Sequence, residues 1–136
     1  MTVSVNIKQL GKKRNKINGV PFYLENEPHT LRELITESVR TCVNSYNGRI
    51  DKTPTPISAE DISAMSELGK IAFGISEGES ADLRKAVDDA ILGFEDGLYR
   101  VFLGEAELTE LDEKVQINEN DSVTFIRLVM LAGRMW

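Results

Sequence analysis

Residues 2–24, TVSVNIKQLGKKRNKINGVPFYL, decide the fold that this sequence predicts. Apolar and polar side chains alternate strictly over residues 2–8, and a second alternation places Val20, Phe22 and Leu24 on one face. A period of two is typical of strands that bury one face. The stretch between the two alternations is rich in glycine, lysine and asparagine, which predicts a turn. The first 24 residues should therefore form a β-hairpin.

The position of the second strand in the sheet follows from Pro21, which lies inside that strand. Proline has no backbone N–H and cannot donate to a neighbouring strand on both sides, so it is confined to edge strands and bulges. We therefore expect the second strand at an edge of the sheet.

A long amphipathic helix is predicted over residues 30–46. Thr30 and Glu33 have the spacing of a capping box, in which each side chain satisfies an unpaired backbone N–H at the helix start. Apolar residues then recur at helical spacing along one stripe. These residues are Leu31, Leu34, Ile35, Val39, Cys42, Val43 and Tyr46.

The middle of the chain, residues 50–97, predicts two further helices after a proline-containing loop. Ser58 and Asp61 have capping-box spacing, and an apolar stripe follows at Ile62, Met65, Leu68 and Ala72. A third helix should begin near Ser80 and end at Gly93 and Gly97. Its inward side chains should be Leu83, Val87, Ala90, Ile91 and Phe94.

The last part of the chain returns to strands. Residues 98–104 predict a strand that ends at Gly104, residues 105–121 a connection rich in turns, and residues 122–130 the final strand. In that final strand Val123 and Phe125 share one face, and Thr124 and Ile126 the other. The expected core unites seven of these positions: Val3, Val5, Ile7, Leu34, Val39, Val123 and Phe125.

Composition and charge limit the classes of function. The 136 residues fit one domain and carry a net charge of −6. Residues 1–49 hold eight Lys/Arg against four Asp/Glu (+4), and residues 50–136 hold eight against eighteen (−10). An acidic chain repels phosphate backbones, which disfavours nucleic acid as a partner. The basic run Lys12–Lys16 is interpreted as a solvated hairpin tip, with a small contact patch as the alternative.

The lengths of the apolar runs and the numbers of cysteine and histidine residues bear on localisation and catalysis. The apolar runs are too short to span a bilayer, and the first residues resemble a strand more than a signal peptide, so a cytoplasmic protein without membrane contact is expected. The single cysteine, Cys42, allows no intrachain disulfide, and its place on the helix stripe favours a core thiol over a nucleophile. The single histidine, His29, has no second histidine to join it. Without a convergent acid–base constellation, an enzyme is not expected, nor is a cofactor or a metal site.

The order of hairpin, long helix and late strands resembles the ubiquitin-like β-grasp superfamily. The stretch YRVFLGEAELTELDEKVQINENDSVTFIRLVMLAG resembles the second half of ubiquitin, and its closing part resembles the small sulfur carriers of molybdopterin and thiamine synthesis. The resemblance covers about residues 2–47 and 98–133. It implies an α+β fold in which a mixed sheet of four to five strands packs on the helix and the first and last strands pair in parallel. Residues 50–97 would then be a helical insertion in a single domain, 1–136, with residues 129–136 as a C-terminal tail.

The tail departs from the resemblance. Sulfur carriers end in Gly-Gly, whereas this chain has Ala132-Gly133 followed by Arg134, Met135 and Trp136. A carrier is adenylated at a free terminal glycine carboxylate, so carrier or modifier activity at Gly133, with an adenylating enzyme as partner, would first need removal of the last three residues. Without Gly-Gly, the sequence favours a ubiquitin-like interaction module that binds another protein through its sheet surface and apolar tail.

The residues expected to contact a partner protein follow from this resemblance and from side-chain size. Phe102 and Ile126 should lie on the outward side of the sheet, where the family's usual binding patch lies. Met130 and Trp136 carry most of the apolar area of the tail. Trp136 could equally pack on the protein's own body, because a large indole favours burial wherever it is found. The oligomeric state stays open.

Overall fold

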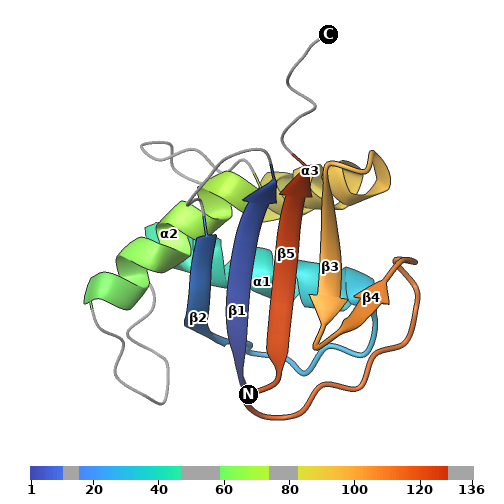
Figure 1. Cartoon of the computed structure of the whole chain (residues 1–136), viewed down its shortest axis with the longest axis horizontal. Coiled ribbons are helices and arrows are strands. Elements are labelled where there is room, and N and C mark those ends of the chain that lie inside the picture. The colour runs from blue at the N-terminus through green and yellow to red at the C-terminus, as the bar shows by residue number, and fades with distance from the viewer. Residues whose placement is uncertain (11–15, 47–58, 74–82, 129–136) are drawn as a thin grey trace, which may run out of the picture.

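The protein has an α+β fold, and in the residues that the structure describes three helices pack on a five-stranded mixed sheet (Figure 1). The computed structural model describes residues 1–10, 16–46, 59–73 and 83–128. The strands are β1 (Thr2–Leu10), β2 (Lys16–Tyr23), β3 (Tyr99–Leu103), β4 (Ala106–Leu108) and β5 (Ser122–Leu128). The helices are α1 (Leu31–Tyr46), α2 (Ala59–Phe73) and α3 (Leu83–Glu95).

The order of strands across the sheet is β2-β1-β5-β3-β4. The central pair, β1 and β5, is parallel and joins the two ends of the chain, while all other pairs are antiparallel. Pro21 lies opposite Ser4 in β2, and β2 is an edge strand. The prediction drawn from Pro21 is therefore confirmed. The strand β4 was not predicted, because its three residues lie within a stretch that the sequence presents as a loop.

The start of α1 follows the predicted capping box in part. The Thr30 hydroxyl accepts the backbone N–H of Glu33 at 3.2 Å, as expected. The Glu33 carboxylate, however, accepts the N–H of His29 at 2.8 Å and not that of Thr30. Backbone carbonyls of a distant loop complete the cap, because Leu31 and Arg32 donate to the carbonyls of Glu113 and Leu111. The first turn of α1 is thus fixed both by its own sequence and by the segment before β5.

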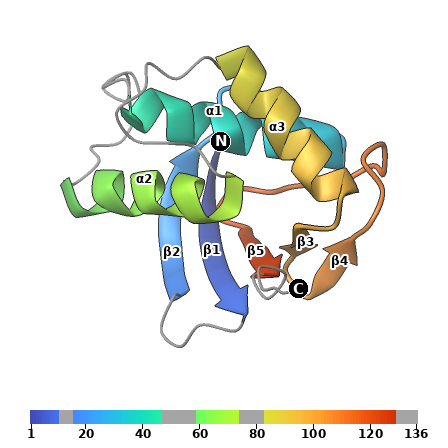
Figure 2. The ribbon, with the colours of Figure 1, turned by 90° about the horizontal axis from the view of Figure 1, so that it is seen from above.

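All three helices lie on one face of the sheet, and α1 contacts both α2 and α3 (Figures 1 and 2). The seven residues of the expected core are each fully buried, which confirms that prediction. Four aromatic rings extend the core toward α2 and α3 through edge-to-face contacts, with centroids 5.2–6.1 Å apart. These rings belong to Phe73, Phe94, Tyr99 and Phe125.

The helices α2 and α3 fall where the sequence predicts two helices. Met65, Leu68 and Ala72 are buried as expected, whereas the side chain of Ile62 and the residues 57–58 and 80 lie outside the described parts. The expected end at Gly93 is wrong, because Gly93 is buried inside α3.

Gly93 lies beside β3, since a Cβ built on it would lie 3.5 Å from the Tyr99 ring, an ordinary van der Waals contact. The helix ends instead through Gly97, at φ 75°. There the N–H groups of Gly97 and Leu98 donate to the carbonyls of Phe94 and Gly93, the pattern of a Schellman cap.

Candidate functional site

The face of the sheet opposite the three described helices holds two of the predicted contact residues, Phe102 and Ile126. They lie on neighbouring strands, since Phe102 in β3 pairs with Thr124 and Ile126 in β5 pairs with Arg100. The two residues are therefore diagonal neighbours, roughly 7–8 Å apart between Cα atoms in such a ladder and within reach of an aromatic side chain. Both are half-buried, in contrast to the fully buried Val101 and Phe125 of the opposite face.

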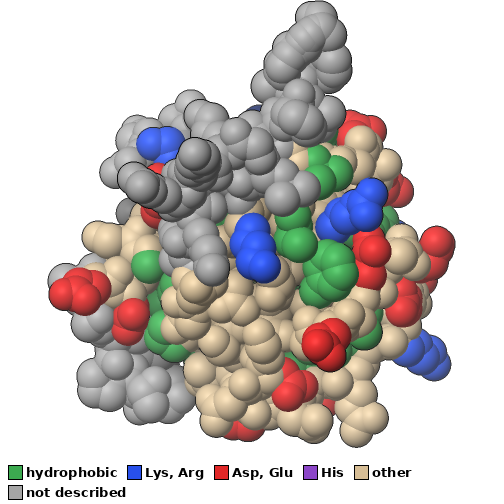
Figure 3. Space-filling view, in the orientation of Figure 1, with side chains coloured by type: hydrophobic (Ala, Val, Ile, Leu, Met, Phe, Trp, Pro, Cys, Tyr) green, Lys and Arg blue, Asp and Glu red, His purple; other side chains and the backbone are tan. Residues whose placement is uncertain are grey.

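Charged side chains flank this apolar pair. In the register of the sheet Ile126 lies between Lys8 of β1 and Arg100 of β3, and both of these residues are exposed. Glu107 of β4 lies opposite Phe102, and its carboxylate is 3.9 Å from the Arg100 guanidinium. Figure 3, which views this face, shows hydrophobic side chains beside Lys and Arg. We call Lys8, Arg100, Phe102 and Ile126 the sheet-face patch.

The other half of the same face is polar, and its side chains form hydrogen bonds within the sheet. The Asn6 side-chain amide donates to the hydroxyls of Ser122 and Thr124, at 2.9 and 3.2 Å. Its carbonyl oxygen accepts the N–H of Gly19 at 2.7 Å. Gly19 has φ 68° and lies where β2 carries an extra residue relative to β1. Asn6 therefore ties three strands together and leaves the apolar part of the face to β3 and β5.

The remaining predicted site residues, Met130, Ala132, Gly133 and Trp136, lie outside the described residues, as does the basic run over residues 12–15. The last described strand, β5, ends at Leu128. The structure thus brings together Phe102 and Ile126 and does not address the tail.

The thiol of Cys42 is fully buried in α1, which confirms the expected core position. Burial raises the pKa of this thiol far above its ordinary value, because the interior cannot solvate a thiolate. Since the thiolate is the reactive form of cysteine, Cys42 does not offer a nucleophile at neutral pH.

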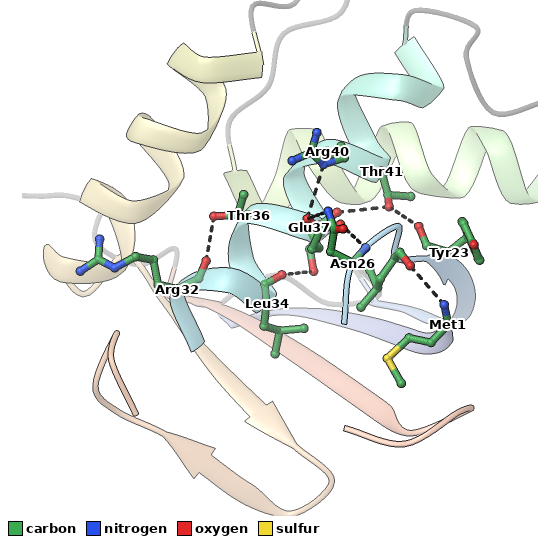
Figure 4. Close-up of polar contacts among 11 residues, drawn as sticks. Met1, Tyr23, Asn26, Arg32, Leu34, Thr36, Glu37, Arg40 and Thr41 are labelled. Carbon is green, nitrogen blue, oxygen red and sulfur yellow. Dashed lines mark hydrogen bonds and ion pairs between the residues drawn. The ribbon is translucent and has the colours of Figure 1, made fainter. Parts of the chain in front are cut away.

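A buried polar cluster around Glu37 was not predicted (Figure 4). Glu37 is 5% exposed, and its carboxylate accepts the backbone and side-chain N–H groups of Asn26 at 3.3 Å each. It also lies 3.5 Å from Nε of Arg40. The Thr41 hydroxyl donates to the carbonyl of Tyr23 at 3.0 Å. These contacts fix the segment after β2 to α1, so we assign the cluster a structural role.

A second unpredicted feature is an open cleft of about 560 Å³ where β3 and β4 meet the end of α3 and the start of α1. We call it the edge cleft. Its lining comes from three separate stretches of the chain, at residue 32, residues 94–100 and residues 107–112, which explains why no single stretch of sequence signals it. Carboxylates predominate at its rim, and its floor is apolar.

Metal-ligand clusters and membrane-spanning helices are both absent from the residues that the structure describes. Comparison of the chain with family models, curated proteins and solved structures gives no match. The sheet-face patch and the edge cleft are therefore the two candidate sites on the described surface.

Proposed function

We propose that this protein is a ubiquitin-like β-grasp module that binds another protein through the sheet-face patch. The β-grasp assignment is supported by the parallel pairing of β1 with β5 and by the edge position of β2, since the resemblance implies both. The packing of α1 against one side of the sheet agrees with the same fold.

The observation that carries the binding function is that Phe102 and Ile126 are diagonal neighbours on the face opposite all three described helices. A half-buried aromatic and a half-buried aliphatic side chain, side by side, lose further contact with water when a partner covers them. Complete burial of such side chains gives roughly 1.5–3 kcal/mol each relative to full exposure, so the part still available here is about half of that.

The flanking cations suit this role. Lys8 and Arg100 place positive charge on either side of Ile126, on a protein whose net charge is negative. Charges at the rim of an interface chiefly raise association rates and select partners, while the apolar centre holds the complex. The apolar tail, which follows β5 in the chain, would add a second contact through Met130 and Trp136.

The proposal is tested by substituting the patch and measuring capture of a partner. The chain and its Phe102→Ser and Ile126→Ser variants would serve as baits in lysate of the native cell, with captured proteins identified by mass spectrometry. We expect a protein that the unaltered chain captures and both variants lose. Melting temperatures should change little, because neither side chain is fully buried.

The matched control is Leu92→Ser. Leu92 is a large apolar residue of α3 that is 55% exposed and lies on the helical layer, away from the sheet-face patch. This variant should capture the same partner as the unaltered chain. If Phe102→Ser and Ile126→Ser unfold the protein, the two residues are core and the patch does not exist. Retention of the partner by both variants would also refute the proposal.

A further inference from the structure

The edge cleft shares Arg100 with the sheet-face patch, and its other lining residues do not belong to that patch. Its floor consists of four apolar side chains: Phe94, Tyr99, Leu108 and Leu111. Tyr99, Leu108 and Leu111 are at most 9% exposed, and Phe94 is partly buried against the core. A volume of about 560 Å³ is within the range of ligand sites in proteins. The cleft is open to solvent along one side, which suits part of a larger partner.

The rim of the edge cleft is acidic. Four carboxylates line it, from Glu95, Glu107, Glu110 and Asp112, against the two guanidinium groups of Arg32 and Arg100. Each guanidinium already has an anion near it: Arg32 lies 3.4 Å from Asp112, and Arg100 lies 3.9 Å from Glu107.

The carboxylates of Glu95 and Glu110 are exposed, and within the described residues neither forms an ion pair. The rim thus carries two negative charges in excess.

The cleft is held in shape by hydrogen bonds that need no ligand. The Glu113 carboxylate accepts the N–H groups of Thr109 and Glu110, at 2.9 and 3.3 Å, and so closes the turn on one side of the cleft. Backbone bonds between the start of α1 and residues 111–115 fix the same turn to the helix. On the other side, the cap at Gly97 sets the direction in which the chain leaves α3. A partner would therefore meet a preformed site, with little entropy lost on ordering it.

We propose that the edge cleft binds an arginine- or lysine-bearing segment of a partner protein. Long cationic side chains bury an apolar stem and keep the charged head near water, which matches an apolar floor beneath an acidic rim. The partly buried ring of Phe94 adds a surface for cation–π attraction. An acidic segment would meet the excess carboxylates and be repelled. The cleft and the sheet-face patch share Arg100, but the charges and apolar side chains on which this inference depends belong to other residues, so Phe102 and Ile126 can be altered without touching them.

The test uses a defined probe, the peptide acetyl-Gly-Arg-Gly-Arg-Gly-amide, titrated into the ¹⁵N-labelled full chain at low ionic strength. A peptide with citrulline in place of arginine has nearly the same shape without the charge. We expect the arginine peptide to shift amide signals of residues 94–98 and 108–112, and the citrulline peptide to shift them far less. Binding should weaken as salt is added, because the contacts are exposed and screened.

The decisive variant is the double substitution Glu95→Gln and Glu110→Gln, which keeps size and removes the two excess charges. Exposed charge pairs contribute little each, so the dissociation constant should rise about three- to tenfold. The control, Glu60→Gln with Glu67→Gln, removes two exposed carboxylates of α2 outside the cleft. It should leave the dissociation constant nearly unchanged.

Four results would overturn the proposal. Equal binding of the citrulline peptide would show that charge does not matter. An equal loss in the α2 control would show attraction to the acidic chain as a whole. Signal shifts confined to β1 and β5 would place the peptide elsewhere. If the Phe102→Ser variant still binds the peptide, the cleft acts separately from the sheet-face patch. If that variant loses the peptide, the two surfaces form one site and the inference is wrong.

Discussion

The phenol hydroxyl of Tyr99 in β3 donates a 2.6 Å hydrogen bond to the backbone carbonyl of Ala90 in α3. Tyr99 is 2% exposed and also forms edge contacts with Phe73, Phe94 and Phe125. One side chain thus connects the sheet to both α2 and α3. The part of the chain that the resemblance treats as an insertion is therefore part of the same core.

The Tyr99→Phe variant removes this hydrogen bond and keeps the ring. A typical buried hydrogen bond contributes about 0.5–1.5 kcal/mol to stability, so the free energy of unfolding should fall by about that amount. Urea denaturation at pH 7 would measure it. No loss of stability would mean that α3 is not fixed to β3 through this contact.

The same residue gives an alkaline pH dependence. Burial raises the pKa of Tyr99 well above its ordinary value of about 10, with the nearby Arg127 charge opposing that shift in part. The unfolded chain therefore loses its phenol proton at a lower pH than the folded chain. The stability from this group is complete below pH 10 and is lost as the pH rises further.

Urea denaturation between pH 8 and pH 11 tests this dependence. The unaltered chain should lose more stability over that range than Tyr99→Phe does. The difference between the two chains isolates Tyr99 from the other groups that titrate there. Parallel curves would contradict the predicted shift.

The buried position of Cys42 predicts a protected thiol. In native protein at pH 8, a thiol reagent such as 5,5′-dithiobis(2-nitrobenzoate) should react very slowly. The reagent cannot reach the buried sulfur, and the thiol stays protonated because burial raises its pKa. In urea the same thiol should react at once. Fast labelling of the native chain would show that α1 opens readily at this point.

Phe125→Ala tests the centre of the sheet. Phe125 is fully buried in β5 and touches the rings of Phe73 and Tyr99. Truncating a buried aromatic side chain typically costs about 3–5 kcal/mol. Denaturant melts should show a loss of this size, and a loss below about 1 kcal/mol would contradict the packing described above.

Deletion of residues 134–136 tests the tail, about which the sequence leaves alternatives. If Trp136 contacts a partner, the deletion should weaken partner capture and leave the melting temperature nearly unchanged. A fall in stability of about 2–3 kcal/mol would instead indicate that the indole packs on the protein's own body. ATP–pyrophosphate exchange by the truncated chain with an adenylating enzyme would indicate a carrier that acts through Gly133. We expect the first result.

Local pattern predicted much of this fold. The alternation in β1 and β5, the stripe of α1 and the proline of β2 each follow from the period or the backbone chemistry of a few adjacent residues. The wrong end for α3 has a physical cause too. Gly93 resembles a helix stop in sequence, yet α3 continues through it, because the left-handed residue that ends the helix is Gly97.

The candidate sites were harder to predict. Phe102 and Ile126 could be placed on one face because strand alternation is local, but their cationic neighbours depend on register between distant strands. The edge cleft gathers residues from positions 32 to 112 and has no local signal. The Glu37 cluster was missed for a similar reason, since its partner Asn26 lies in the loop before α1.

Both edges of the sheet offer little backbone to another chain. On β2, Pro21 has no N–H to donate, and Thr41 occupies the carbonyl of Tyr23. On the other side, β4 is three residues long. An incoming strand would find few free groups to pair with, so the sheet resists extension by a second molecule. Strand addition uses backbone groups and tolerates many sequences. The partner proposed above would depend on side chains instead, so a single substitution could abolish its binding.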